Sequence, residues 1–62
     1  MTRLKDAKYK GVKMKFFRDK KFGVVYADAY GIGVLAQGRT KRTALDNAKV
    51  QIRYKKRRGN IR

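Results

Sequence analysis

The sequence contains no cysteine, histidine, proline or tryptophan. Zinc sites built from thiolates or imidazoles are therefore excluded, because Cys and His side chains are the usual zinc ligands. The absence of cysteine also fits an intracellular protein. No apolar run approaches the roughly 20 residues of a membrane span. The first residues, Met-Thr-Arg-Leu-Lys-Asp, lack the apolar stretch of a signal peptide. We therefore expect no metal, no cofactor and no membrane partner.

Acidic residues are also scarce, because the chain has four Asp and Glu residues in total. All four are aspartates, and they are spread over the chain at Asp6, Asp19, Asp28 and Asp46. No histidine or cysteine is present to act as a general base or a nucleophile beside them. The sequence therefore does not predict an enzyme.

Basic residues dominate instead, since 19 Lys and Arg give a formal net charge of +15 on 62 residues. Charge of this size works against a compact chain through self-repulsion. A polyanion relieves the repulsion, and each phosphate that is neutralised also releases condensed counterions. A membrane surface would favour one basic amphipathic helix with a wide apolar face, whereas the aromatic residues here lie mostly in strand-like segments. The charge pattern therefore predicts a nucleic-acid partner.

Alternation of apolar and polar residues predicts three strands. Residues 1 to 8 show no clear periodicity and are predicted as a flexible basic arm. Over residues 9 to 17, Val12, Met14 and Phe16 face one way and basic and aromatic residues face the other. A turn follows at residues 18 to 21, and a second strand at 22 to 30 places Ala27 and Ala29 inward and Tyr26 outward. Glycines then mark a turn, and residues 34 to 37 form a short third strand.

A helix is predicted from Lys41 to Arg57. Thr40 supplies its N-cap, and an apolar stripe follows at helical spacing. Lys41 and Arg42 occupy the first turn, where the helix dipole disfavours cations. This placement indicates an anion that docks there, such as phosphate, although two solvated surface charges are the simpler alternative. Gly59 is predicted to end the helix.

The predicted fold is α+β, with a three-stranded antiparallel sheet packed on one C-terminal helix in the order β-β-β-α. Residues 9–58 form a single domain between the arm at 1–8 and a tail at 59–62. One face of the sheet is covered by the helix. The other face stays open and is basic, with aromatic side chains between the cations.

Two segments resemble known DNA-binding domains. Tyr9-Lys10-Gly11-Val12-Lys13 is similar to the first-strand motif Tyr-Arg-Gly-Val-Arg of plant ethylene-response factors. The stretch from Gly38 to Ala48 resembles the sheet-to-helix junction in the N-terminal arm-binding domains of lambda-type phage integrases. The resemblance implies three strands on one helix, with the sheet inserted in the DNA major groove. The strand tryptophans of the plant domains are absent here, and we expect no integrase activity of this chain.

The sequence therefore predicts a small duplex-DNA-binding protein or module that places its open sheet face in the major groove. We expect its role to be regulatory or architectural, and its origin to be a phage or a mobile element. Strand cations reach phosphates or guanine edges, Gln37 reads adenine if it faces outward, and turn and helix-start cations clamp the backbone. The expected location is the cytoplasm of a bacterial or phage-infected cell, or the nucleoid. The predicted DNA-binding residues are Lys13, Lys15, Arg18, Lys20, Lys21, Tyr26, Gln37, Arg39, Lys41 and Arg42.

Two alternatives remain open at this point. The run Thr40-Lys41-Arg42-Thr43-Ala44 also resembles the start of the last helix in double-stranded-RNA-binding domains, which implies RNA binding through the helix-start cations. A module that binds an acidic host protein would also explain the charge. Val50 and Tyr54 form a small patch on the predicted helix that suits such a contact, or weak self-association.

Overall fold

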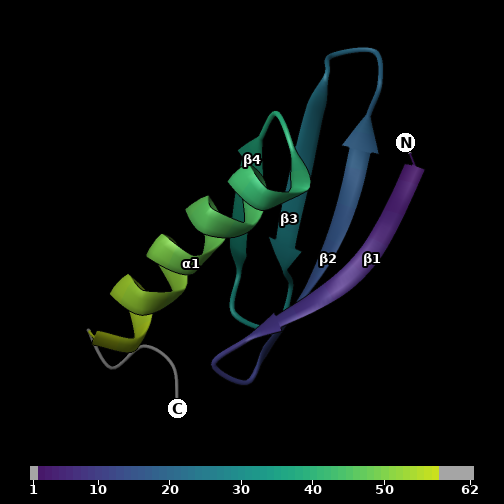
Figure 1. The fold of residues 1–62 in the computed structure, drawn as a ribbon. Coiled ribbons are helices and arrows are strands. Elements are labelled where there is room, and N and C mark those ends of the chain that lie inside the picture. The colour runs from purple at the N-terminus through teal and green to yellow at the C-terminus, as the bar shows by residue number, and fades with distance from the viewer. Residues whose placement is uncertain (1, 58–62) are drawn as a thin grey trace.

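A computed structural model describes residues 2–57 of the chain. The elements are β1 (Thr2–Tyr9), β2 (Val12–Asp19), β3 (Val24–Ala29), β4 (Val34–Gly38) and α1 (Lys41–Arg57) (Figure 1). The strands form one antiparallel sheet in the order β1-β2-β3-β4. The α+β class, the antiparallel sheet and the C-terminal helix are confirmed. The predicted number of strands is wrong, because the sheet has four strands instead of three.

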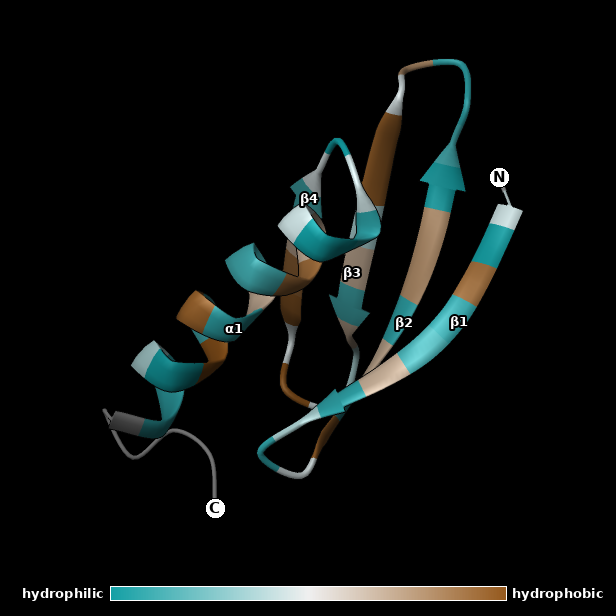
Figure 2. Cartoon of the chain, in the orientation of Figure 1, coloured by the Kyte–Doolittle hydropathy of each residue, from teal (hydrophilic) through white to brown (hydrophobic). Residues whose placement is uncertain are grey.

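The additional strand is β1, which occupies the segment predicted as a flexible arm. β1 pairs with β2, with Leu4 opposite Phe16 and Ala7 opposite Met14. Three positions separate Leu4 from Ala7 while only two separate their partners, so β1 carries one extra residue in a bulge. Because of the bulge, Leu4 and Ala7 both pack against the core. They are three positions apart, which breaks the period-two alternation by which a strand is recognised in a sequence. β1 is also mostly hydrophilic (Figure 2), so its few buried residues are difficult to recognise in the sequence.

Three tight turns connect the strands. Lys10 and Gly11 join β1 to β2 with φ angles of 51° and 80°, the positive values that a two-residue hairpin turn requires. The predicted strand over residues 9 to 17 is therefore split at this turn. In the next turn the Asp19 carboxylate accepts hydrogen bonds from the backbone N–H groups of Lys21 and Phe22, as expected for a turn aspartate.

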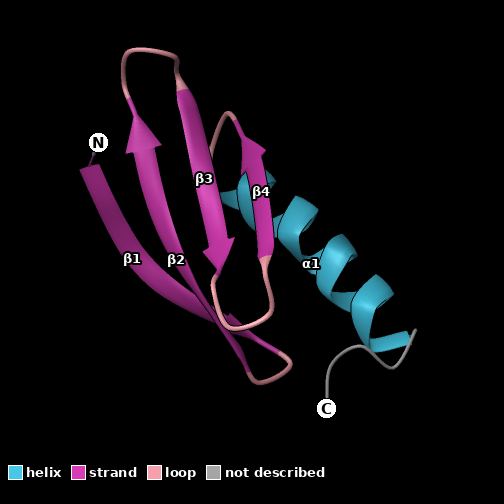
Figure 3. Ribbon diagram, turned by 180° about the vertical axis from the view of Figure 1, so that it is seen from behind, coloured by secondary structure: helices cyan, strands magenta, loops and turns pink. Residues whose placement is uncertain are grey.

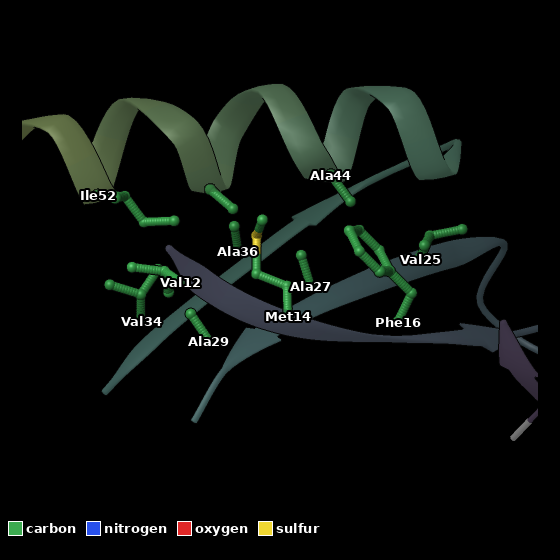
Figure 4. Close-up of a cluster of buried hydrophobic side chains, with 11 residues drawn as sticks. Val12, Met14, Phe16, Val25, Ala27, Ala29, Val34, Ala36, Ala44 and Ile52 are labelled. Carbon is green, nitrogen blue, oxygen red and sulfur yellow. The ribbon is translucent and has the colours of Figure 1, made fainter. Parts of the chain in front are cut away.

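The core lies between α1 and the inner face of the sheet (Figure 4). Small residues predominate where α1 lies over β3 and β4. Ala27, Ala29 and Ala36 of the strands and Ala44 and Ala48 of the helix are all buried, which allows close approach. Larger side chains fill the remaining space. They are Val12, Met14, Phe16, Val25, Val34 and Ile52.

The junction between β4 and α1 fixes where the helix begins. The Thr40 side chain accepts a hydrogen bond from the Thr43 N–H at 3.2 Å, so the predicted N-cap is confirmed. Gly38 lies so close to the first helical turn that an added Cβ would come within 2.7 Å of both the Ala44 nitrogen and the Thr43 side chain. A residue without a side chain is therefore needed at Gly38.

The predicted helix from Lys41 to Arg57 agrees with α1. The predicted helix stop at Gly59 and the tail at 59–62 lie outside the described residues. Between residues 2 and 57, no helix is long and apolar enough to cross a membrane.

Candidate nucleic-acid interface

The sheet face opposite α1 is open to solvent (Figure 3). Because side chains alternate along a strand, residues between the buried positions of each strand point to this face. Cross-strand register places Lys8 opposite Lys13, Phe17 opposite Tyr26, and Tyr26 opposite Gln37. We call this surface the open face. It consists of Arg3, Lys8, Lys13, Lys15, Phe17, Asp19, Val24, Tyr26, Asp28, Leu35 and Gln37.

Cations gather at the β1–β2 side of the open face. Lys8 and Lys13 are directly opposite each other, an arrangement that is unfavourable in an isolated sheet because like charges face each other across the strands. Lys15 is opposite Asp28, and its Nζ lies 4.8 Å from the centroid of the exposed Tyr30 ring. An anion that docks on this side would relieve the repulsion between Lys8 and Lys13.

Aromatic and amide side chains continue the open face toward β4. Phe17 and Tyr26 are half-buried partners across β2 and β3, and such pairs stabilise a sheet. Their remaining exposed surface lies beside the cations. Gln37, exposed on β4 next to Tyr26, supplies an amide that can both donate and accept hydrogen bonds.

Few of the chain's own carboxylates neutralise these cations. Arg3 forms a salt bridge with Asp6 at 3.2 Å, the one ion pair within residues 2–57. The Asp19 carboxylate is engaged by backbone N–H groups in its turn. Most of the positive charge therefore remains available to a partner.

The structure brings together four of the predicted binding residues, Lys13, Lys15, Tyr26 and Gln37, on the open face. Lys8 joins them, although the sequence placed it in a flexible arm that could follow a nucleic-acid backbone or minor groove, because the strand that carries it was not predicted. The signal that could have found β1 is Lys10-Gly11, in which glycine permits the positive φ of a hairpin turn.

The other predicted residues lie away from the open face. Arg18 is on the same side of β2 as Phe16, which faces the helix. Lys20 and Lys21 are exposed in the turn between β2 and β3. Arg39 is exposed between β4 and α1, and Arg42 is exposed in the first turn of the helix.

Lys41 has a structural partner that the sequence did not predict. Its Nζ lies 5.0 Å from the centroid of the Phe16 ring, on the helix side of the sheet. A cation over an aromatic face is stabilised by about 0.5–1 kcal/mol at exposed sites. This contact offsets the unfavourable position of Lys41 at the helix N-terminus, so a docked anion is not needed to explain it.

The described residues contain no group of three or more side chains able to hold a metal ion. Comparisons of the chain with known protein families, with curated proteins and with solved structures find no match.

Proposed function

We propose that this protein binds duplex DNA by laying the open face of its sheet in the major groove. The observation that carries the proposal is the arrangement of Lys8, Lys13 and Lys15 beside Phe17 and Tyr26 on one solvent-exposed face. A net charge of +15 supports the same conclusion, since few of the described cations are paired with a carboxylate.

The dimensions of the open face suit the groove. The major groove of B-DNA is about 12 Å wide and admits a two-stranded ribbon. Neighbouring strands are about 4.8 Å apart, so two adjacent strands of the sheet fit within that width.

The side chains divide into two roles in this proposal. Lys8 and Lys15 contact phosphates, which fixes the position of the sheet and supplies affinity without sequence preference. Gln37 and Lys13 reach base edges, where an amide pairs with adenine and an ammonium group contacts guanine. Lys20 and Lys21 extend the phosphate contacts at the end of the sheet.

The first experiment is the salt dependence of affinity for duplex DNA. The four phosphate contacts of Lys8, Lys15, Lys20 and Lys21 predict that log affinity falls with log salt concentration with a slope of about −3.6 or steeper. A flat salt response would refute the electrostatic mechanism.

A pair of double variants then locates the interface. Lys8→Gln/Lys15→Gln removes two cations from the open face, whereas Arg53→Gln/Lys56→Gln removes two from α1. Each pair lowers the net charge from +15 to +13, because two positive charges are lost (15 − 2). The open-face variant should make the slope shallower by about 1.8, with a much smaller change in the helix variant. Equal losses would mean that net charge alone governs binding.

Competition between matched DNA and RNA duplexes distinguishes the two nucleic-acid hypotheses. The major groove of A-form RNA is too deep and narrow for side chains to read, so an open-face mechanism predicts preference for DNA. Preference for RNA, abolished by Arg42→Gln, would instead support binding through the helix start. Saturable binding to an acidic protein with weak affinity for both duplexes would favour a protein partner.

A further inference from the structure

A groove of about 490 Å³ runs along the outer edge of β4, on the side of the sheet opposite β1. The described residues that line it come from β3, β4 and α1, and none of them is charged. They are Tyr26, Leu35, Ala36, Gln37, Asn47, Val50 and Gln51. We call this surface the neutral groove.

The absence of charge from the neutral groove is unusual for this chain. Charged residues make up 37% of the sequence, and they are mostly exposed. An acidic partner would be recognised by cations, which the neutral groove does not contain. Two copies of a chain with net charge +15, in contrast, repel each other least where neither presents a charge.

Apolar side chains are exposed around the neutral groove. Leu35 is 62% exposed and Val50 is 55% exposed, and both are among the large hydrophobic residues that the fold leaves open. Exposed apolar residues that line a groove together favour association more than scattered ones do. Each also has an aliphatic side chain that the groove of a second copy can accommodate.

β4 is an edge strand, so part of its backbone has no partner strand. Asn47 donates a hydrogen bond from Nδ2 to the backbone oxygen of Gln37 at 2.7 Å, so this carbonyl points away from β3 and is already paired with α1. In an antiparallel ladder, every second residue directs its N–H and C=O to the same edge. The N–H and C=O of Leu35 therefore point outward too. An edge strand of this kind is a template for pairing with another chain.

We propose that the neutral groove is a self-association surface, where a second copy of this chain docks by the same surface. The contact is isologous, so Leu35 and Val50 of each copy meet the groove of the other. If the two β4 strands pair antiparallel, the sheet continues across the interface with both open faces on one side. The inference does not rest on the proposed DNA binding, although Tyr26, Leu35 and Gln37 belong to both surfaces.

Sedimentation equilibrium in sodium chloride tests the proposal. Between about 0.1 M and 1 M salt the Debye length falls from about 10 Å to about 3 Å, which screens repulsion between the copies. Self-association should therefore strengthen as salt rises, whereas DNA affinity should weaken. The opposite salt responses make failure of this inference distinguishable from failure of the proposed function. A monomer at both salt concentrations, at the highest protein concentration reached, would overturn the inference.

A charge placed in the neutral groove tests its location. Val50→Lys should raise the dimer dissociation constant about tenfold or more, because it brings two ammonium groups into one apolar contact. Phe22→Lys is the matched control, since Phe22 is 69% exposed in a distant turn and each variant has a net charge of +16 (15 + 1). Equal weakening by both variants would refute the location. Circular dichroism confirms that each variant is folded.

Amide NMR spectra recorded at increasing protein concentration provide a direct readout. The amide signals of Leu35 and Gln37 should shift with concentration in the unmodified chain and remain fixed in Val50→Lys. Titration with a glutamate-rich peptide tests the competing hypothesis that an acidic partner binds in the neutral groove. Peptide-induced shifts at the same amides, without any shift caused by protein concentration, would overturn the assignment to a second copy.

Discussion

Replacement of Lys8 by glutamate should stabilise the fold while weakening binding to nucleic acid. Lys8 lies directly opposite Lys13 across β1 and β2. Both side chains are exposed on the open face. Lys8→Glu exchanges a repulsive cross-strand pair for an attractive one without changing any buried contact. Lys8 therefore lowers stability, and a bound polyanion would offset this effect.

The magnitude follows from cross-strand pair energies. Opposite-charge pairs contribute roughly 0.2–1 kcal/mol, and like charges directly opposite are unfavourable. Exchange of one for the other should raise the free energy of unfolding by about 1 kcal/mol. In a domain of this size, 1 kcal/mol corresponds to an increase in Tm of roughly 4–8 °C.

Thermal unfolding followed by circular dichroism measures this change. Lys20→Glu is the matched control, because Lys20 is exposed in the turn between β2 and β3 and has no cross-strand partner. Both variants lower the net charge from +15 to +13, since one positive charge is lost and one negative charge is gained. The difference between them isolates the Lys8–Lys13 pair, and it should shrink as salt rises. If Lys8→Glu were no more stable than Lys20→Glu, the pair would not be repulsive and the reasoning would fail.

Three further variants test the described contacts, each by thermal or urea unfolding. Gly38→Ala should lower stability by about 1–3 kcal/mol, because its methyl group would overlap the Thr43 side chain; unchanged stability would show that the junction can widen. Thr40→Ala should cost about 1 kcal/mol through loss of the N-cap, with Thr40→Ser as the control that keeps the hydroxyl. Asp19→Ala should cost about 0.5–1.5 kcal/mol for each turn hydrogen bond it loses, while Asp19→Asn, which keeps an acceptor, should cost less.

Much of the fold could be predicted from side-chain periodicity. Met14 and Phe16 on β2 and Ala27 on β3 follow a strict alternation, so their burial was predicted correctly. β1 could not be predicted in the same way, because the bulge between Leu4 and Ala7 changes which side each residue faces. A bulge depends on the partner strand, which local sequence does not specify.

The candidate site was predictable for residues on well-defined strands. Lys13 and Tyr26 were placed on the open face from alternation alone, and the register confirms their positions. Lys41 differs, because its long side chain reaches Phe16, which is far away in the sequence. The sequence alone does not distinguish a helix-start lysine that packs on an aromatic ring of another strand from one that binds a phosphate.

The two edges of the sheet differ in a way that limits growth by strand addition. β4 presents an uncharged edge, whereas β1, the opposite edge, carries Arg3, Lys5 and Lys8. Lysine-rich edge strands discourage further pairing, because each added chain would bring like charges together. If two copies join through β4, the outer margins of the pair are both β1. Assembly would then end at two copies, because β1 would prevent the pair from growing into a fibre.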